Sequence, residues 1–292
     1  MSAKTFDALW ELYKPRKVRG KKSEAELVRV YETYIRPRLG SKLVIKTTYE
    51  AIDKIHEKMK DTPYQANRVL SLIRPLFKHA QALRWIPEGH NPAKHVTLFA
   101  ERKRRRHMRK GEAPKIAAAI RNHQERSPEA CVFLWLIIFT GMRPGEIKAA
   151  RWGQLHGSKL TLKEHKSSDK TGAEREVMLP PIAMEKLALL PRGRAEEKII
   201  KIGTPEWIWR WIRVEASCRD LRIYDLRHTF ATYALEQGFT LDQIGESLGH
   251  ANPATTKIYA EMNTRSRQRV ALDSSLAILN DMNIKETEDA FE

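Results

Sequence analysis

Three helix starts and two helix stops lie within residues 223–262, and they constrain the fold of that stretch more than any other feature of the chain. The starts are marked by Asp225, by the pair Thr240 and Gln243, and by Asn252-Pro253, and the stops by Gly238 and Gly249. Polar caps satisfy the free N–H groups of a first turn, proline loses no hydrogen bond at the first helical position, and glycine closes a helix. We therefore expect three short helices whose ends bring Arg227, His250 and Tyr259 into one pocket.

The same stretch carries a distinctive order of short motifs. Residues 226–232 read LRHTFAT, residues 248–250 read LGH, and Tyr259 follows nine residues after His250. This order resembles the tyrosine recombinases, also called the phage integrase family. The resemblance implies that Arg227 and His250 bind the scissile phosphate, and that Tyr259 is the covalent nucleophile, giving a 3′-phosphotyrosine and a free 5′-hydroxyl.

A second arginine stands at a predicted helix start. Residues 140–147 read TGMRPGEI, in which Gly141 permits a sharp bend and Pro144 begins the next helix, so that Arg143 lies at its N-terminus. Helix starts attract anions through free N–H groups as well as side chains. The motif is similar to the first arginine box of the family, and Glu146 is placed to hold Arg143 in position.

Residues 159–163 and 176–180 alternate in the manner of strands, and residues 169–173 form the turn between them. This hairpin resembles the one that carries the family's catalytic lysine. The resemblance assigns that role to Lys170, with Lys166 as the alternative because the register of a hairpin is uncertain from sequence.

The resemblance defines a chemistry that needs no metal, cofactor or ATP. Arg143 and Arg227 would neutralise the charge that develops on the phosphate, since a guanidinium fork binds two phosphate oxygens and stays charged. His250 would add a hydrogen bond to a nonbridging oxygen. Lys170 would protonate the leaving 5′-hydroxyl, and Tyr259 would conserve the bond energy as a phosphotyrosine.

One position departs from the family pattern. The family usually has histidine three residues before the second arginine, where this chain has Tyr224. A phenol with a pKa of ~10 is a poor base near neutral pH, so Tyr224 is expected to donate a hydrogen bond to phosphate instead. His228, one helical turn later, is interpreted as structural.

The positive charge of the chain is concentrated in its N-terminal part. The net charge is +17, and residues 1–110 hold 27 Lys/Arg against 11 Asp/Glu, whereas residues 111–292 hold 26 against 25. Such asymmetry indicates a polyanionic partner, nucleic acid before an anionic membrane surface. The longest apolar run, residues 131–139, is too short to span a bilayer and predicts a buried helix. Cys131 and Cys218 match no metal-ligand spacing and are predicted core residues.

The length of 292 residues allows two domains, and we predict a mainly α fold with a small antiparallel β-sheet. Residues 1–100 are expected to form an all-helical core-binding DNA-binding domain, residues 111–284 an α+β tyrosine-recombinase catalytic domain, and residues 285–292 a disordered acidic tail. Between the two domains, residues 101–110 form a basic linker. Its cations are predicted to cross the DNA backbone as a strap, with a solvated hinge as the alternative: Arg102, Lys103, Arg104, Arg105, Arg106, Arg109 and Lys110.

Local signals predict details within these domains. In the first hundred residues we expect four helices, with an unstructured basic segment at 14–22. Capping boxes begin at Ser23 and Thr47, Pro37 stops a helix, and Pro75 kinks or breaks one. In the second domain, Trp207 and Trp211 share one helix face, as core residues or as packing at the edge of DNA.

The sequence therefore predicts a site-specific DNA recombinase of the phage or mobile-element integrase type. Its expected partners are double-stranded DNA with an inverted-repeat core site, three further copies in a homotetramer on paired sites, and accessory DNA-bending or directionality proteins, but no membrane. It is expected in the cytoplasm of a bacterial or phage-infected cell, associated with the nucleoid. The alternatives are an Xer-type resolvase or invertase, a type IB topoisomerase, and an inert DNA-binding protein on the same fold.

Overall fold

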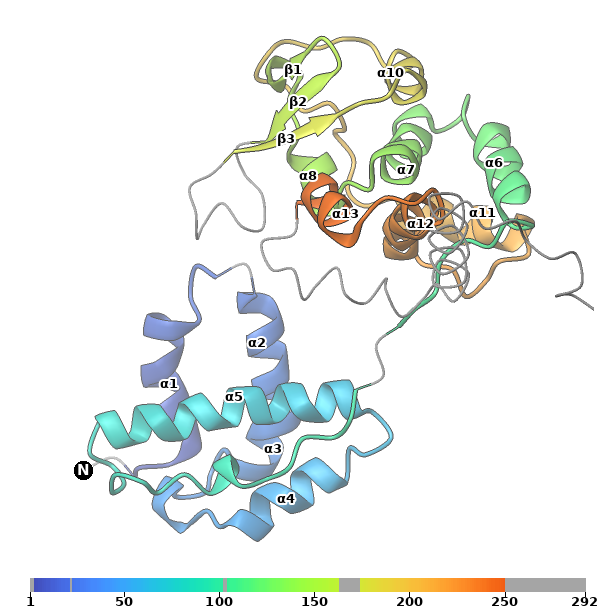
Figure 1. Cartoon of the computed structure of the whole chain (residues 1–292). Helices are drawn as coiled ribbons and strands as arrows, with labels where there is room; N and C mark the ends of the chain where they lie inside the picture. The colour runs from blue at the N-terminus through green and yellow to red at the C-terminus, as the bar shows by residue number, and fades with distance from the viewer. Residues whose placement is uncertain (1–2, 22, 102–103, 163–173, 250–292) are drawn as a thin grey trace, which may run out of the picture. The chain divides into compact units, whose positions relative to one another are not determined.

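A computed structural model describes residues 3–21, 23–101, 104–162 and 174–249 of the chain (Figure 1). The chain divides into two compact units, Met1–Lys103 and Arg104–Glu292, and the division falls inside the basic run at 101–110. As predicted, the described residues are mainly helical, with one small antiparallel sheet.

The described part of the first unit is helical, and its longest helix, α5, packs against α1, α2 and α4. Its core includes Trp10 stacked on Tyr31, with ring centroids 4.2 Å apart. The elements are α1 (Phe6–Lys17), α2 (Glu24–Val30), the π-helical turn η1 (Tyr31–Ile35), α3 (Arg36–Leu39), the 3-10 turn η2 (Val44–Lys46), α4 (Tyr49–Glu57), α5 (Pro63–Ala82) and the 3-10 turn η3 (Pro92–Lys94).

Several predicted boundaries in this unit are wrong. Helix α1 continues through Lys17 into the segment expected to be unstructured. Ser23 makes no capping hydrogen bond, and the cap of α4 is Thr48, one residue later than predicted, which accepts from the N–H of Ala51. Pro37 does not stop the chain of helical turns, because it lies in the first turn of α3, where its missing N–H costs nothing.

Pro75 does not break α5, which runs without interruption from Pro63 to Ala82. Buried residues stand on both sides of the proline, among them Leu72 and Leu76. Packing of this apolar face against three other helices outweighs the one backbone hydrogen bond that proline removes.

The second unit is built around α7, whose residues from Ala130 to Ile137 are all buried, as the apolar run predicted. Helices α6, α8, α10 and α12 pack around α7, and α11 packs on α6. The elements are α6 (Ala113–Asn122), α7 (Pro128–Thr140), α8 (Pro144–Ala149), the 3-10 turn η4 (Trp152–Gln154), β1 (Leu155–His156), β2 (Lys159–Leu162), β3 (Arg175–Met178), α10 (Pro181–Leu187), α11 (Glu206–Glu215), α12 (Ile223–Glu236) and α13 (Leu241–Leu248).

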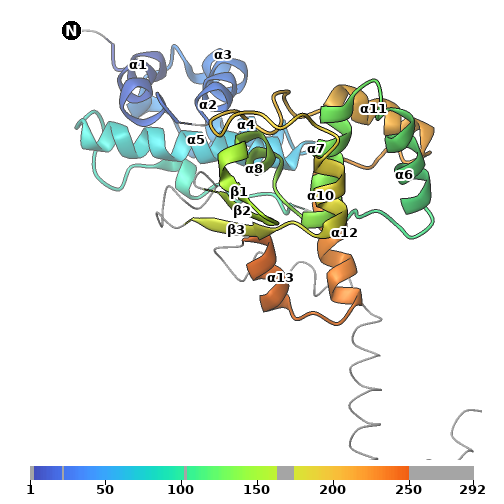
Figure 2. The same ribbon diagram turned by 90° about the horizontal axis from the view of Figure 1, so that it is seen from above.

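The sheet has the order β1-β2-β3 and is antiparallel throughout. In the pairing of β2 with β3, Leu160 lies opposite Val177 and Leu162 opposite Arg175. Figure 2 shows the sheet at one end of the second unit and the α6–α11 pair at the other, with α7 between them. The predicted hairpin is confirmed by β2 and β3, and its connecting residues 163–173 lie outside the described part.

Helix α11 is confirmed, but the interpretation of Trp207 and Trp211 as core residues is wrong. Trp209 is the buried tryptophan, and its indole N–H donates to the carbonyl of Leu221 at 3.0 Å. Trp207 and Trp211 are 56% and 66% exposed. The two side chains lie one turn apart on the exposed face of α11, and the other predicted role, packing at the edge of DNA, stays a prediction.

Among the described residues, no helix is long and apolar enough to cross a membrane. Cys131 and Cys218 are buried free thiols, as predicted, and burial raises the pKa of both.

Candidate active site

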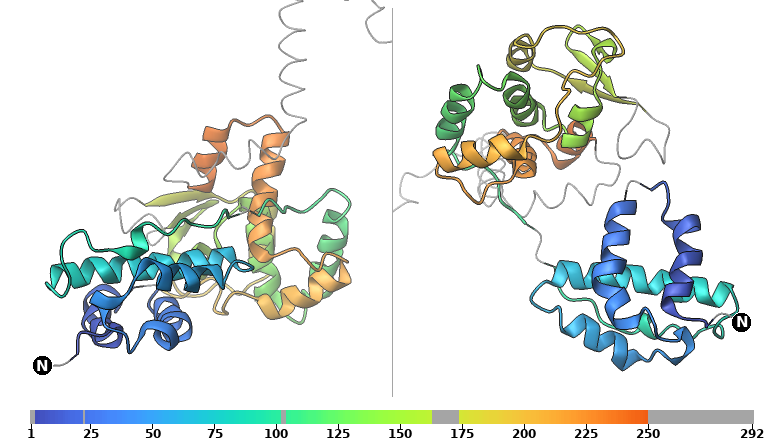
Figure 3. Two further views of the ribbon diagram at one scale, coloured as in Figure 1. Left: turned by 90° about the horizontal axis from the view of Figure 1, so that it is seen from below. Right: turned by 180° about the vertical axis from the view of Figure 1, so that it is seen from behind.

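Three arginines from three different elements meet at the C-terminal end of α13. Arg143 precedes α8, Arg175 begins β3 and Arg227 lies in α12. They donate to the last carbonyls of α13 and its cap, which belong to Ser247, Leu248 and Gly249. Figure 3 shows α12 and α13 side by side in the second unit. The unpaired carbonyls at a helix end carry partial negative charge, so this end of α13 attracts cations.

Arg143 is the N-cap of α8, as predicted from the bend at Gly141 and the proline that follows. Its Nη1 donates to Oε1 of Glu146 at 2.7 Å, and its Nη2 donates to the carbonyl of Gly249 at 3.0 Å. The carboxylate of Glu146 also accepts from the N–H of Arg143 at 2.8 Å. Glu146 therefore holds Arg143 by both backbone and side chain, which confirms the expected contact.

Arg227 is fully buried. Its Nη1 donates to the carbonyl of Gly141, and its Nη2 donates to the carbonyl of Leu248 at 2.8 Å. The same Leu248 carbonyl accepts from Nη1 of Arg143 at 3.4 Å, so one oxygen brings the two arginines together. Burial, and then the charge of Arg143, lower the pKa of Arg227 to about 10, which still leaves it charged at neutral pH.

Arg175 completes the cluster and was missed by the sequence analysis. Its Nη1 donates to Oε2 of Glu146 at 2.5 Å and its Nη2 to the carbonyl of Ser247 at 2.6 Å, in a side chain that is 6% exposed. Burial lowers the pKa of Arg175. Burial also acts to raise the pKa of Glu146, but the charges of Arg175 and Arg143 outweigh it, so the pKa is lowered and the carboxyl stays ionised. The available signal was an arginine at a position of β3 that alternation predicts to point inward.

Two guanidinium nitrogens of this cluster are buried without a hydrogen-bond acceptor in the described part of the chain. Within the described residues, Nε of Arg227 and Nε of Arg175 are buried and have no hydrogen-bond partner. A buried donor without an acceptor is costly, so such an atom in native proteins calls for an explanation such as an absent ligand. One carboxylate among two buried arginines and the partly buried Arg143 leaves a surplus of positive charge suited to an anion.

The position of Gly249 explains why the LGH motif has glycine at its centre. It ends α13 in the left-handed region, at φ 64°, as predicted. A Cβ at this position would lie 2.3 Å from Nε of Arg175. Only glycine therefore lets the turn after α13 pass over the guanidinium of Arg175.

Tyr224 is 46% exposed on the first turn of α12. Its ring meets the ring of His228 edge-on, with centroids 5.4 Å apart. The pKa of His228 is lowered, mainly by burial, so its imidazole is neutral at pH 7. This arrangement agrees with the structural interpretation of His228.

The start of α12 differs from the prediction. The helix begins at Ile223, three residues earlier than an N-cap at Asp225 would place it, so Asp225 is not its N-cap. Asp225 instead reaches back from the third helical position to accept from the N–H of Arg222 at 2.8 Å. Asp225 also forms an ion pair with Arg104 at 2.9 Å.

The basic linker is therefore not uniformly available to DNA. Arg104 pairs with Asp225, and Arg106 pairs with Glu112 and with Asp220, each at 2.7 Å. Arg104 is exposed despite this pairing, as are Arg105, Arg109 and Lys110, and Lys110 lies 3.9 Å from the carboxylate of Glu236. The remaining predicted site residues lie outside the described part of the chain: Arg102, Lys103, Lys170, its alternative Lys166, His250 and Tyr259.

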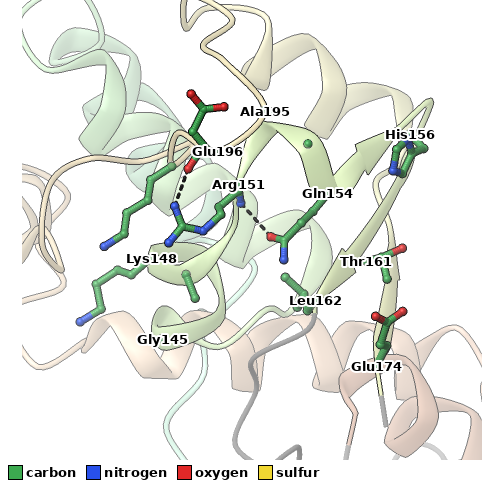
Figure 4. A pocket seen from close by; sticks show the side chains of 13 residues that line it. Gly145, Lys148, Arg151, Gln154, His156, Thr161, Leu162, Glu174, Ala195 and Glu196 are labelled. Carbon is green, nitrogen blue, oxygen red and sulfur yellow. Dashed lines mark hydrogen bonds between the residues drawn. The ribbon is translucent and has the colours of Figure 1, made fainter. Parts of the chain in front are cut away.

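A separate cavity of about 980 Å³ lies against α8 and the sheet, and none of the three clustered arginines lines it. Figure 4 shows Lys148 and Arg151 on one side of it and Glu174 on the other, with Arg151 bonded to Gln154 and to the carbonyl of Glu196. Leu162 and Glu174, which flank the hairpin connection, form part of its rim. No group of three or more metal-ligating side chains occurs in the portion of the chain that the structure describes.

Comparison with known proteins decides the family. The sequence model of the phage integrase family matches residues 106–266, which is more than half of the 292 residues. The chain belongs to the phage integrase family. The matched range contains the whole arginine cluster of this integrase-family protein, together with the candidate nucleophile.

Relatives of this integrase-family protein include recombinases of the Xer type. It is 38% identical over 64 residues to tyrosine recombinase XerA of Pyrococcus horikoshii, an alignment covering 21% of this chain and 22% of XerA. It is 28% identical over 176 residues to tyrosine recombinase XerD of Halalkalibacterium halodurans, covering 53% and 57%. The chain thus spans between about a fifth and just over half of the length of these relatives.

The fold is that of a solved integrase. A lambda integrase fragment (residues 75–356), crystallised as a dimer bound to a COC′ core site, superimposes with a TM-score of 0.68 at 19% identity, covering 89% of this chain and 97% of that one. At this identity the likeness establishes the fold alone.

Proposed function

We propose that this protein is a site-specific DNA recombinase that cuts and rejoins DNA through a covalent tyrosine intermediate. The observation that carries the proposal is the cluster of the partly buried Arg143 with the buried Arg175 and Arg227, in which two Nε donors lack an acceptor among the described residues. A phosphodiester oxygen supplies the acceptor that Nε of Arg227 lacks, whereas Nε of Arg175 lies beneath Gly249 and is not assigned to the phosphate. Membership of the phage integrase family supports this ligand over other anions.

In this proposal Arg143 and Arg227 bind the nonbridging oxygens of the scissile phosphate. Both are already fixed by the end of α13, so little reorganisation is needed when charge develops in the transition state. Arg175 acts on the position of Glu146 and through it on Arg143. Preorganised charge of this kind stabilises the negative charge that develops on the phosphate in the transition state.

Three further roles rest on the family resemblance. Tyr259 attacks the phosphate and leaves a 5′-hydroxyl, which Lys170 protonates, with Lys166 as the alternative acid. His250 follows Gly249 directly and is proposed to donate to a nonbridging oxygen. Tyr224, which is 46% exposed, is proposed to donate a hydrogen bond to phosphate in place of the usual histidine. His228, whose pKa burial lowers, keeps a structural role.

We propose double-stranded DNA with an inverted-repeat core site as the substrate, bound by a core-binding domain at 1–100 and by a catalytic domain at 111–284. Four copies would assemble on paired sites, helped by accessory DNA-bending or directionality proteins. Integration by a phage or mobile element, in a bacterial or infected cell, is the favoured subtype. The Xer relatives support resolution or inversion as the second candidate.

The proposal is tested with a nicked synthetic core site, on which cleavage releases a short fragment and traps the covalent complex. The wild-type protein is expected to form the adduct, and Tyr259→Phe, which loses only the attacking oxygen, is expected to bind the site without forming it. Arg227→Ala is expected to reduce the cleavage rate by ~10²-fold or more. An adduct that persists in Tyr259→Phe and maps to another residue by mass spectrometry would refute the assignment.

A further inference from the structure

Three residues of the basic run, Arg104, Arg106 and Met108, contact distant parts of the second unit. Arg104 is paired with Asp225 although its side chain is 36% exposed, whereas Arg106 is 11% exposed in its side chain and Met108 only 6% overall. The sequence gives no sign of these contacts, since their partners lie far away along the chain.

Arg104 is hydrogen-bonded to the first turn of α12. Its Nε donates to both carboxylate oxygens of Asp225, at 3.2 and 3.1 Å, and its Nη2 donates to one of them at 2.9 Å and to the carbonyl of Asp220. Asp225 is 2% exposed and also accepts from the N–H of Arg222. A buried carboxylate held by a guanidinium fork and a backbone N–H has a fixed position, and it stands two residues before Arg227.

Further contacts extend this attachment along the strap. Arg106 bridges Glu112 and Asp220, with Nη2 2.7 Å from one carboxylate and Nε 2.7 Å from the other. The N–H of Met108 donates to the hydroxyl of Thr229 at 2.7 Å, and that hydroxyl donates to the carbonyl of Asp225 at 2.9 Å. The strap is thus joined to α12 at both its first and its second turn.

We propose that Arg104 is a positioning residue of the recombinase site, which holds Asp225 so that Tyr224 and Arg227 face the scissile phosphate, and that it is not one of the linker's DNA contacts. Without Arg104, the buried carboxylate of Asp225 would stand unpaired beside the phosphate-binding arginine. It would then repel the DNA phosphate and loosen the first turn of α12. This inference rests on the proposed recombinase function.

The test separates DNA affinity from cleavage. Arg104→Gln is compared with Lys115→Gln, which removes one exposed cation from α6, outside the site and the strap. Affinity for the core site is measured at several salt concentrations, and the rate of covalent complex formation is measured on the nicked site at saturating protein. Arg104→Gln is expected to match Lys115→Gln in the slope of log affinity against log salt. Its cleavage rate should be about tenfold lower, a size typical of coupled neighbours.

A double-mutant cycle identifies the partner. Asp225→Asn alone should also reduce the cleavage rate about tenfold. The double variant should cleave about tenfold more slowly than wild type, and not the hundredfold more slowly that two independent sites would give. Should Arg104→Gln prove unfolded by circular dichroism, Arg104→Lys replaces it, since lysine keeps the charge but loses the fork. That variant should bind DNA normally and cleave more slowly than wild type.

Two results would overturn the inference. One is a salt slope reduced by ~0.9 in Arg104→Gln with wild-type cleavage at saturation, which is the behaviour of a phosphate contact. The other is a double-mutant cycle in which the losses of cleavage rate from Arg104→Gln and Asp225→Asn add up. Absence of any covalent complex with the wild-type protein would instead reject the proposed function, so the two failures are distinguishable.

Discussion

Replacing Glu146 with glutamine tests the charge balance of the arginine cluster. Glu146 is 2% exposed and is the carboxylate that contacts both Arg143, at 2.7 Å, and Arg175, at 2.5 Å. Glutamine keeps the shape and one acceptor oxygen but removes the negative charge. Arg143, Arg175 and Arg227 would then share a buried site with no carboxylate to balance them.

The expected loss of folding stability in Glu146→Gln follows from the burial of this carboxylate. Breaking a buried ion pair by removing one partner costs about 3–5 kcal/mol, because the other charge is left uncompensated. For a unit of this size, 1 kcal/mol shifts the melting temperature by about 2–4 °C, so Glu146→Gln should melt roughly 6–20 °C lower. DNA should recover part of that loss, since a polyanion binds the folded state of the variant and supplies the missing negative charge.

Acid pH should have the same effect as the substitution. The pKa of Glu146 is lowered in the folded protein: burial raises it, but the opposing charges of Arg175 and Arg143 outweigh burial. A carboxyl with a depressed folded pKa contributes stability that is fully present above its unfolded pKa, and that is lost as pH falls through the folded pKa. The stability difference between wild type and Glu146→Gln should therefore narrow below about pH 4.5.

The assay is thermal melting by circular dichroism, with and without core-site DNA, at neutral and acid pH. Glu176→Gln is the matched control, because Glu176 pairs with Lys159 at 2.8 Å in a hairpin position that is 58% exposed. An exposed pair of that kind is worth about 0–1 kcal/mol, so the control should melt within a few degrees of wild type. Equal small shifts in both variants would refute the view that Glu146 balances buried cations.

Three other substitutions test the site. Lys170→Ala should slow cleavage of normal DNA far more than cleavage of DNA with a 5′-sulfur leaving group, because the sulfur departs without a proton. If the sulfur substrate instead restores cleavage only in Lys166→Ala, Lys166 is the general acid. Tyr224→His should retain cleavage and add an inflection near pH ~6–7 to the pH–rate profile, and an inactive variant would mean that the pocket is shaped around the phenol. Gly249→Ala should lower both melting temperature and cleavage, because its Cβ would meet Arg175 at 2.3 Å and its φ is 64°; wild-type values for both would contradict the close approach.

Much of the local structure could be predicted from residues near one another in the chain. The capping box of Thr240 and Gln243, the stop at Gly249 and the helix start after Arg143 are all confirmed. In each case a side chain or a backbone conformation satisfies groups within a few residues. Some errors were also local: Thr48 rather than Thr47 caps α4, and Asp225 supports α12 from inside its first turn.

The sequence by itself determined the family, the two arginine boxes and the helix ends that carry them, because those signals are short and complete within their own segments. Only the tertiary structure decided which cations are structural. Arg175 meets Glu146 across 29 residues and Arg104 meets Asp225 across 121. Periodicity cannot predict such pairs, since whether an arginine faces water, a carboxylate or a phosphate depends on which distant element packs against it.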